Sequence, residues 1–124
     1  MKPIYKRFAV LFVVTFMYSQ NLFAGEADIA PVRVESVAII AVATGGHIPG
    51  NMEIKIRGGF LVPAGLFCSN TYITTKAVDD PGRTMLTLLL TNQGTNRYVR
   101  LRITDDPAHT AYPGRCSLQI VEIR

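Results

Sequence analysis

The sequence has no tryptophan, and only two cysteines and two histidines occur among its 124 residues. The cysteines are far apart, so neither a CxxC redox motif nor a zinc site of paired cysteines is indicated. A GxSxG turn for a nucleophilic serine is missing, as is the lysine-containing glycine loop that holds a phosphate. The length excludes a multi-domain enzyme. We therefore expect a single-domain protein that is not an enzyme and that has no cofactor and no metal.

A hydrophobic run long enough to cross a membrane is also missing from the N-terminal region. The apolar stretch at 8–17 has ten residues, whereas a spanning helix needs about 20. Basic residues precede this stretch and small residues follow it, which is the pattern of a secretory signal peptide. We expect a signal peptide at 1–24, with cleavage after Ala24 or, alternatively, after Ala27. The protein is then exported, periplasmic or secreted, with no membrane span once the signal is removed.

Positive charge is concentrated in this targeting segment. The whole chain has 13 basic and 9 acidic side chains, for a net charge of +4. Three of the basic residues lie in 1–24, so the mature chain keeps 10 basic and 9 acidic side chains and a net charge of +1. Nucleic-acid binding requires a concentrated cationic face. We expect no nucleic-acid partner.

The two cysteines predict a structural disulfide. An exported chain of this size with two cysteines is expected to join Cys68 to Cys116. Closing a loop of that length restricts the unfolded chain by roughly 4 kcal/mol, a large part of the net stability of a small domain. The alternatives are two reactive thiols or a metal-binding pair.

The mature chain is a series of short apolar runs separated by Gly, Pro, Asn and Asp. Residues 25–33 show no periodicity and are expected to form a flexible leader before a single domain at 34–124. β-branched runs and alternating patterns predict five strands, at 34–43, 52–57, 66–75, 97–103 and 116–123. The fold class is therefore mainly β.

Residues 83–92 decide between two architectures. Their leucines and the acidic residues ahead of them favour a short helix that Asp80 or Thr84 caps. A helix between the third and fourth strands predicts a small OB-like five-stranded barrel with one short helix and one disulfide. If 83–92 instead form a strand, the alternative is a β-sandwich of the adhesin type.

Several features follow one another in a recognisable order. Ser36 and a Thr-Gly-Gly turn at 44–46 precede an alternating strand, a strand with a cysteine, a leucine-rich helix, a glycine turn, a V-x-L strand and a final strand with a cysteine. Over about residues 34–124, this order resembles the B subunits of subtilase-cytotoxin and typhoid-toxin type. The resemblance implies a secreted OB-fold protein that assembles as a pentamer and binds cell-surface glycans. The family's small-residue and Gly-Lys helix ending is replaced by Gly-Thr-Asn-Arg at 94–97.

The resemblance also implies a first candidate site. In that family a serine at the start of the first strand contacts sialylated sugar, and Ser36 occupies a similar place. Without tryptophan, an aromatic ring for sugar stacking has to come from Tyr72 or Tyr98. Asn70 and Thr71 supply short polar groups beside Tyr72. These residues are the candidate glycan contacts.

Strand 97–103 provides a second candidate surface. Alternation places Tyr98, Arg100 and Arg102 together on its outward side. Because arginine presents a planar fork to carboxylates, this surface fits an anionic sugar or an acidic partner protein. The alternative function is thus a periplasmic interaction or inhibitor domain. The arginines are otherwise expected to be solvated or to pair across strands with Glu53 or Glu122.

Acidic and histidine-containing segments are expected to form ordinary turns. The DDP sequences at 79–81 and 105–107 are typical of turns, and His109 near the second does not complete a metal site. A Ser-His-Asp combination has no local signature in this chain. The serines and histidines available for one are Ser36, Ser69, Ser117, His47 and His109. A small secreted enzyme is the third interpretation.

Overall fold

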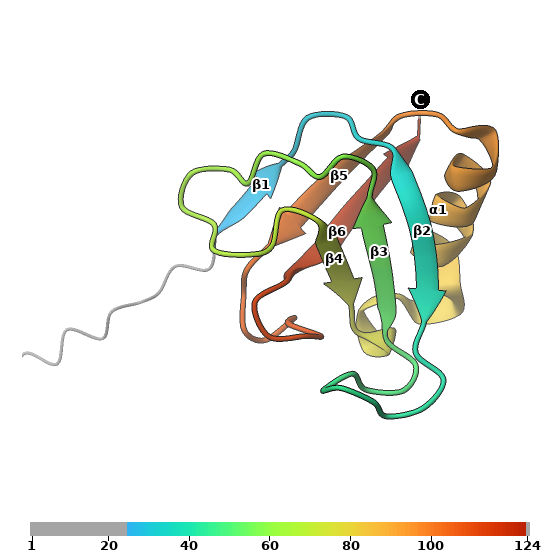
Figure 1. Ribbon diagram of the computed structural model, residues 1–124, viewed down its shortest axis with the longest axis vertical. Helices are drawn as coiled ribbons and strands as arrows, with labels where there is room; N and C mark the ends of the chain where they lie inside the picture. Colours follow the sequence, from blue (N-terminus) through green and yellow to red (C-terminus); the bar gives the residue numbers. More distant parts are fainter. Residues whose placement is uncertain (1–24, 124) are drawn as a thin grey trace, which may run out of the picture.

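The computed structural model describes residues 25–123, and its fold is mainly β. The signal peptide predicted at 1–24 lies outside the described residues. One mixed sheet of six strands, one α-helix and one disulfide make up the described part (Figure 1). Within 25–123, no helix has the length and apolar character needed to span a membrane. The elements in chain order are β1 Glu26–Asp28, β2 Val34–Ile39, β3 Met52–Ile56, β4 Tyr72–Thr75, the 3-10 turns η1 Ala77–Asp79 and η2 Pro81–Arg83, α1 Thr84–Thr95, β5 Val99–Thr104 and β6 Cys116–Ile123.

The strands lie in the order β1-β5-β6-β4-β3-β2, and only β4 and β6 run parallel. The two edge strands, β1 and β2, are consecutive in the chain. Between them, Val32 bridges to Val99, the first residue of β5, and the Arg33 carbonyl accepts a hydrogen bond of 2.8 Å from the Arg57 N–H after β3. The segment that contains β1 and β2 therefore forms both edges of the sheet. The sheet is nevertheless not closed, so the predicted five-stranded barrel is not confirmed.

Residues 25–33 are not the irregular leader that the sequence predicts. Glu26–Asp28 form β1, which pairs with β5, and the side chains of Ile29 and Val32 are buried in the core. The prediction failed because this strand has only three residues, too few for an alternating pattern to be visible. Its stability comes from pairing with a strand about 75 residues away in the sequence, which no local pattern reports.

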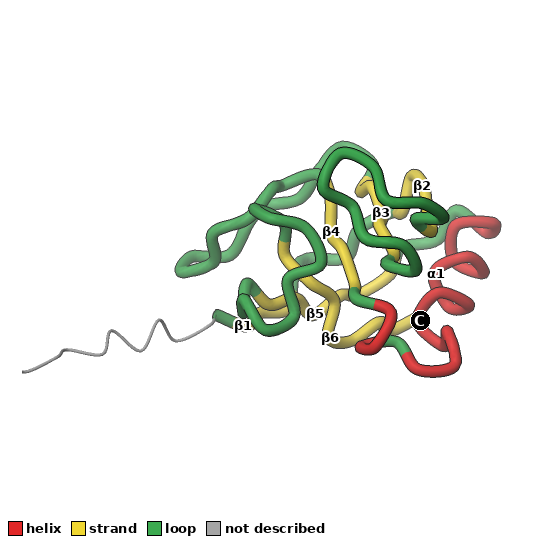
Figure 2. Tube along the Cα trace, turned by 90° about the horizontal axis from the view of Figure 1, so that it is seen from below, coloured by secondary structure: helices red, strands yellow, loops and turns green. Residues whose placement is uncertain are grey.

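The core lies on one face of the sheet and beneath α1. As predicted, alternate residues of β3 and β5 point inward and are buried. These residues are Met52, Ile54, Ile56, Val99, Leu101 and Ile103. Leu89 of α1 joins them, and the helix packs against β2 and β6. Figure 2 shows α1 at one end of the molecule, beside β2, with β1 at the other end.

Helix α1 confirms the helical interpretation of 83–92, and with it the strand alternative and its β-sandwich are excluded. The helix runs further than predicted, to Thr95. Of the two predicted caps, Asp80 is the one used: its carboxylate accepts hydrogen bonds from the N–H groups of Met85 (2.9 Å) and Leu86 (3.2 Å). Asp80 is only 3% exposed. Its negative charge satisfies free N–H groups at the positive end of the helix dipole.

The predicted disulfide between Cys68 and Cys116 is present. Cys116 is the first residue of β6 and is fully buried, whereas Cys68 belongs to the loop before β4. The bridge therefore attaches the long loop at 57–71 to the centre of the sheet. This attachment matters for the candidate site because that loop leads directly into Tyr72.

Candidate functional site

Strand register brings three chemically different side chains to one surface. Ser36 of β2 lies opposite Lys55 of β3, and Lys55 lies opposite Tyr72 of β4. Directly opposed residues point to the same face of a sheet. With a strand spacing of roughly 4.8 Å, the backbones of Ser36 and Tyr72 are about 10 Å apart. We call this surface, defined by Ser36, Lys55 and Tyr72, the β2–β4 face.

Lys55 is the member of this face that sequence analysis missed. It alternates with buried residues in β3, and that pattern indicates only an outward direction. The register of β2 shifts between Val34 and Ser36, and the Glu35 carboxylate lies 2.9 Å from the Lys55 ammonium. The hydrogen bond from Lys55 to Glu35, helped by the attraction of the two charges, raises the pKa of the lysine. Lys55 is therefore a cation on the strand position directly opposite Ser36.

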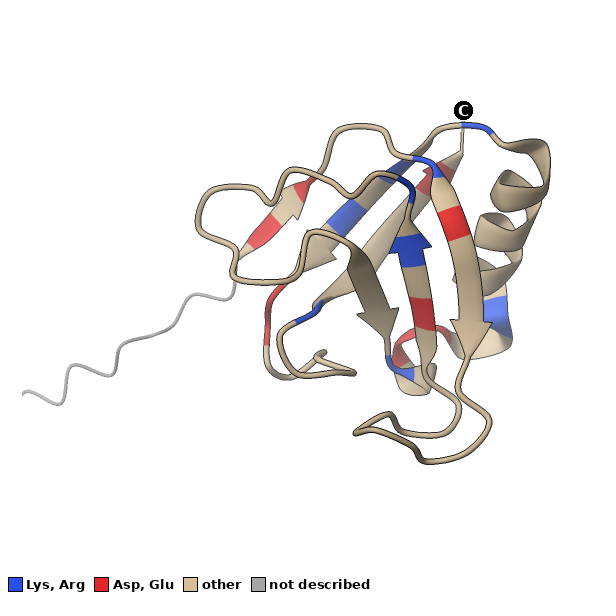
Figure 3. Cartoon of the chain, viewed as in Figure 1, with Lys and Arg blue, Asp and Glu red and all other residues tan. Residues whose placement is uncertain are grey.

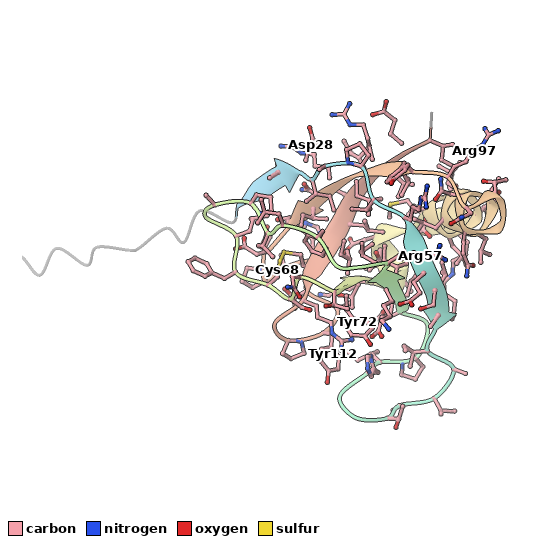
Figure 4. All side chains as sticks on the ribbon, turned by 45° about the horizontal axis from the view of Figure 1, so that its top comes forward. Asp28, Arg57, Cys68, Tyr72, Arg97 and Tyr112 are labelled. Atoms are coloured by element: carbon pink, nitrogen blue, oxygen red, sulfur yellow. A yellow bond between two sulfur atoms is a disulfide. The ribbon has the colours of Figure 1, made fainter. Side chains whose placement is uncertain are left out.

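An arginine holds the tyrosine of the face in position. The Arg115 guanidinium lies between two rings, 4.4 Å from the centroid of Tyr72 and 4.2 Å from that of Tyr112. It also forms an ion pair with Glu53 of β3. The His47 ring stacks 4.3 Å from Tyr112, and its Nε2 is 3.7 Å from a Glu53 oxygen. Figure 4 labels Tyr72 and Tyr112, which lie close together.

We call this cluster of Arg115, Tyr72, Tyr112, Glu53 and His47 the Arg115 stack. It connects four segments: β3, β4, the loop after β2 and the loop before β6. The Tyr112 hydroxyl donates a hydrogen bond of 3.1 Å to the Gly45 carbonyl, which joins the loop after β2 to the loop before β6. Each cation–ring contact contributes about 0.5–1 kcal/mol when exposed and more when water is excluded. The Tyr72 ring is consequently a positioned platform at the border of the β2–β4 face.

Asn70 and Thr71, the other predicted glycan contacts, lie just before β4. The Thr71 hydroxyl donates a hydrogen bond of 2.9 Å to the Asn70 side chain, and Asn70 is exposed. The Asn70 carbonyl also accepts a hydrogen bond from the Phe60 N–H. Of the predicted residues, Tyr72 and this pair thus lie in or just before β4, and Ser36 lies two strands away on β2.

Arg100 and Arg102 lie elsewhere, on the outer side of β5 between β1 and β6. Arg100 is within 3.9 Å of Asp28 and 3.8 Å of Glu122, and Arg102 is within 3.4 Å of Asp28 and 3.5 Å of Glu26. The pKa of Glu26 is lowered by hydrogen bonds from Gln119 first and from Arg102 second. A shallow hollow of about 340 Å³ lies over these residues. The surface is therefore a charge-balanced network.

Two details of the second surface differ from expectation. The predicted cross-strand pairing of an arginine with Glu122 is confirmed for Arg100. The predicted pairing with Glu53 is wrong, because Glu53 pairs with Arg115. Tyr98 precedes β5, and the Arg33 guanidinium lies 4.5 Å from its ring centroid. Tyr98 also lines a different hollow from that of Arg100 and Arg102. The outward direction predicted for the two arginines is therefore correct. Their contacts, and that of Tyr98, involve segments that the alternating pattern of one strand cannot identify.

The serine, histidine and aspartate residues of the loops do not assemble a catalytic triad. His109 Nδ1 is 3.0 Å from the Asp79 carboxylate, which is a close pair. The buried Ser117 hydroxyl, however, donates to the His109 backbone carbonyl (2.6 Å) rather than to the ring. Asp105 accepts hydrogen bonds from the backbone N–H groups of Gly25 and Phe67, and so connects its loop to two segments that are distant in the sequence. Across residues 25–123, no group of three or more His, Cys, Asp or Glu side chains is placed to hold a metal.

Comparison with known proteins returned no matching family model, no matching curated protein and no matching solved structure.

Proposed function

We propose that this protein is an exported glycan-binding protein that recognises an acidic sugar on the β2–β4 face, in the manner of a toxin B subunit. The observation that carries the proposal is the register that aligns Ser36, Lys55 and Tyr72. A hydroxyl can donate and accept hydrogen bonds, and a tyrosine ring offers an apolar surface with a polar tip. The Lys55 ammonium pairs with Glu35, but an ammonium has three N–H donors, so it can also donate to a sugar oxygen. Together these groups match the hydroxyls, carboxylate and apolar ring face of an acidic sugar.

The proposed architecture is a five-stranded barrel of the OB type. The support is that β1 and β2 belong to one segment, which pairs with β5 on one side and with β3 on the other. If residues 26–39 are counted as one bent strand, the sheet has five strands and its two edges meet in that strand. The parallel pairing of β4 with β6 and the helix between β4 and β5 agree with this arrangement.

A ring of five copies is the assembly that the resemblance implies. A shallow polar face binds one sugar weakly, and several such faces on one particle multiply the effective affinity. The mass of residues 25–124 in solution, measured by light scattering under oxidising conditions, tests this assembly. A mass of five protomers is the expected result, and a monomer at all concentrations contradicts the multivalent arrangement.

Binding to immobilised glycans tests the site itself. The oxidised protein is presented to matched pairs of sialylated and desialylated oligosaccharides, together with the variants Ser36→Ala and Lys55→Met. We expect preferential binding to the sialylated member, and a loss of about tenfold or more in each variant, because each removes a hydrogen bond to a charged group or a cation. Lys76→Met is the matched control, since Lys76 lies after the end of β4 and its ammonium donates to the Ala108 carbonyl. Equal binding by all variants rejects the site.

The hollow over Arg100 and Arg102 favours a second candidate function, that of a periplasmic protein-interaction or inhibitor domain. Its alternating arginines and carboxylates offer partners for a peptide that carries both charges. Arg100→Glu is expected to abolish such an interaction and to leave glycan binding intact. Loss of glycan binding in this variant contradicts the assignment of the two functions to separate faces.

A further inference from the structure

Another hollow, whose charged lining residues are both arginines, lies where β2 begins and β3 ends. It has a volume of about 230 Å³. Its lining residues are Pro31, Val32, Arg33, Arg57, Gly59 and Tyr98. In Figure 3, basic segments lie at the start of β2 and at the end of β3, the two elements that border it. We call it the Arg33–Arg57 pocket; it shares no lining residue with the set Ser36, Lys55 and Tyr72.

The backbone holds the two arginines next to each other. The Arg57 N–H donates a hydrogen bond of 2.8 Å to the Arg33 carbonyl, so the residues are neighbours across adjacent segments. The Arg33 guanidinium lies 4.5 Å from the centroid of the Tyr98 ring. Arg57 Nη1 donates to the Asn96 side chain (3.0 Å) beyond the end of α1. Both side chains are thus oriented by neutral partners.

The charge of this pair is not balanced within the described part of the chain. Arg100, Arg102 and Arg115 each have a carboxylate within ion-pair distance, whereas no such pair involves Arg33 or Arg57 among residues 25–123. The acidic residue nearest to Arg33 in sequence, Glu35, is engaged by Lys55. The buried Nε of Arg33 donates to no described residue.

We infer that the Arg33–Arg57 pocket binds an oxyanion, namely a carboxylate, sulfate or phosphate group of a ligand. A guanidinium stacked on an aromatic ring keeps its N–H donors at its edge, where they form a fork that fits two oxygens of an anion. The volume is below the roughly 300 Å³ of pockets for drug-sized ligands, so the pocket suits one charged group.

Gly59 contributes the rim of the pocket. Its φ of +72° favours glycine, and a Cβ at this position would lie 2.9 Å from the Asn70 carbonyl oxygen. The pocket therefore has no side chain on this part of its rim. The inference does not depend on the proposed glycan site.

Titration of the oxidised protein, residues 25–124, with inorganic sulfate, inorganic phosphate and acetate in separate arms tests the pocket. The readout is the NMR signal of each arginine Nε–H group at constant ionic strength. We expect saturable shifts of the Arg33 and Arg57 signals, with Arg100 and Arg102 unaffected. Saturation by sulfate and phosphate alone identifies a tetrahedral anion, and saturation by acetate a carboxylate.

Two substitutions assign the binding to its residues. Arg33→Gln is expected to weaken oxyanion binding about tenfold, since it removes a charge-assisted fork. The matched control Arg100→Gln leaves the Kd unchanged, and Ser36→Ala also leaves it unchanged, which separates this pocket from the glycan face. The inference is overturned if the Nε–H signals of all arginines shift linearly with anion concentration. It is also overturned if Arg33→Gln and Arg100→Gln weaken oxyanion binding equally. The titration of the unsubstituted protein decides the question even if Arg33→Gln fails to fold.

Discussion

Among single residues, Arg115 is a member of the candidate site that could not be predicted from the sequence. Ser36 and Tyr72 could be selected in advance, the first by resemblance and the second as a tyrosine in a β-prone run. Arg115 lies in a loop without periodicity, which it shares with Tyr112, whereas its other partners, Tyr72 and Glu53, belong to the distant strands β4 and β3. No local pattern connects Arg115 to these two strands. Only the folded arrangement shows that this arginine positions the Tyr72 ring.

The pair of Lys55 and Glu35 leads to a prediction about pH. The hydrogen bond to Glu35 raises the pKa of Lys55 above its ordinary value of 10.5. A raised folded-state pKa stabilises the fold below the unfolded pKa of about 10.4, and the contribution is lost as the pH rises through the folded value. Glu35→Gln removes the carboxylate and is expected to lower the pKa of Lys55 toward 10.5. An NMR titration of the lysine side-chain carbons measures this change.

Asp28→Asn is the matched control substitution. Asp28 pairs with Arg100 and Arg102 on the other surface, so removing its charge should leave the pKa of Lys55 unchanged. A Lys55 pKa that does not change in Glu35→Gln would show that the two side chains do not interact in solution.

At the scale of elements, strands with regular alternation were predicted well and short or irregular elements were not. β3 and β5 each place alternate residues in the core, so a period of two is visible in their sequences. β1 has three residues and was missed. Helix α1 was predicted from leucine content and from the acidic residues before it, although its C-terminal end lies three residues further on. Local preferences thus identify an element more reliably than they locate its ends.

The start of α1 supports a prediction about stability. Asp80 is buried and accepts two backbone hydrogen bonds from the first turns of the helix. Asp80→Ala is expected to lower the free energy of unfolding by about 1–2 kcal/mol, since it leaves these donors without a partner. Urea denaturation monitored by circular dichroism measures the change.

Asp28→Ala is the comparison for the helix-cap variant. Asp28 makes only exposed ion pairs with Arg100 and Arg102, and such pairs contribute about 0–1 kcal/mol. The loss in Asp80→Ala should exceed the loss in Asp28→Ala. Equal losses would show that the cap contributes no more than a surface charge does.

At the scale of the whole molecule, the disulfide is the long-range link that the sequence did predict. Cys68 and Cys116 are 48 residues apart, and their bond ties a long loop to the buried start of β6. Replacing both cysteines by alanine is expected to lower the free energy of unfolding by roughly 2–5 kcal/mol, mainly because the unfolded chain gains freedom. Thermal and urea unfolding of the variant and of the oxidised protein measure the difference.

The same experiment has a chemical control. Reducing agent should lower the unfolding midpoint of the original chain toward that of the double-alanine variant and should have no effect on the variant. Stability that does not change on reduction contradicts a structural role for the bond.

The sequence by itself was enough to predict the mainly β class, the helix after the DDPG turn and the pairing of the cysteines. It is also the sole basis for expecting a signal peptide and export. Composition, periodicity and cysteine count are local or additive properties, so one chain is enough to read them. Tertiary structure alone decided that Ser36, Lys55 and Tyr72 share a face and that Arg33 and Arg57 border one pocket. Strand register and loop contacts set these neighbours. They depend on residues that are distant in the chain, and a shift of one residue would move each strand's side chains to the opposite face.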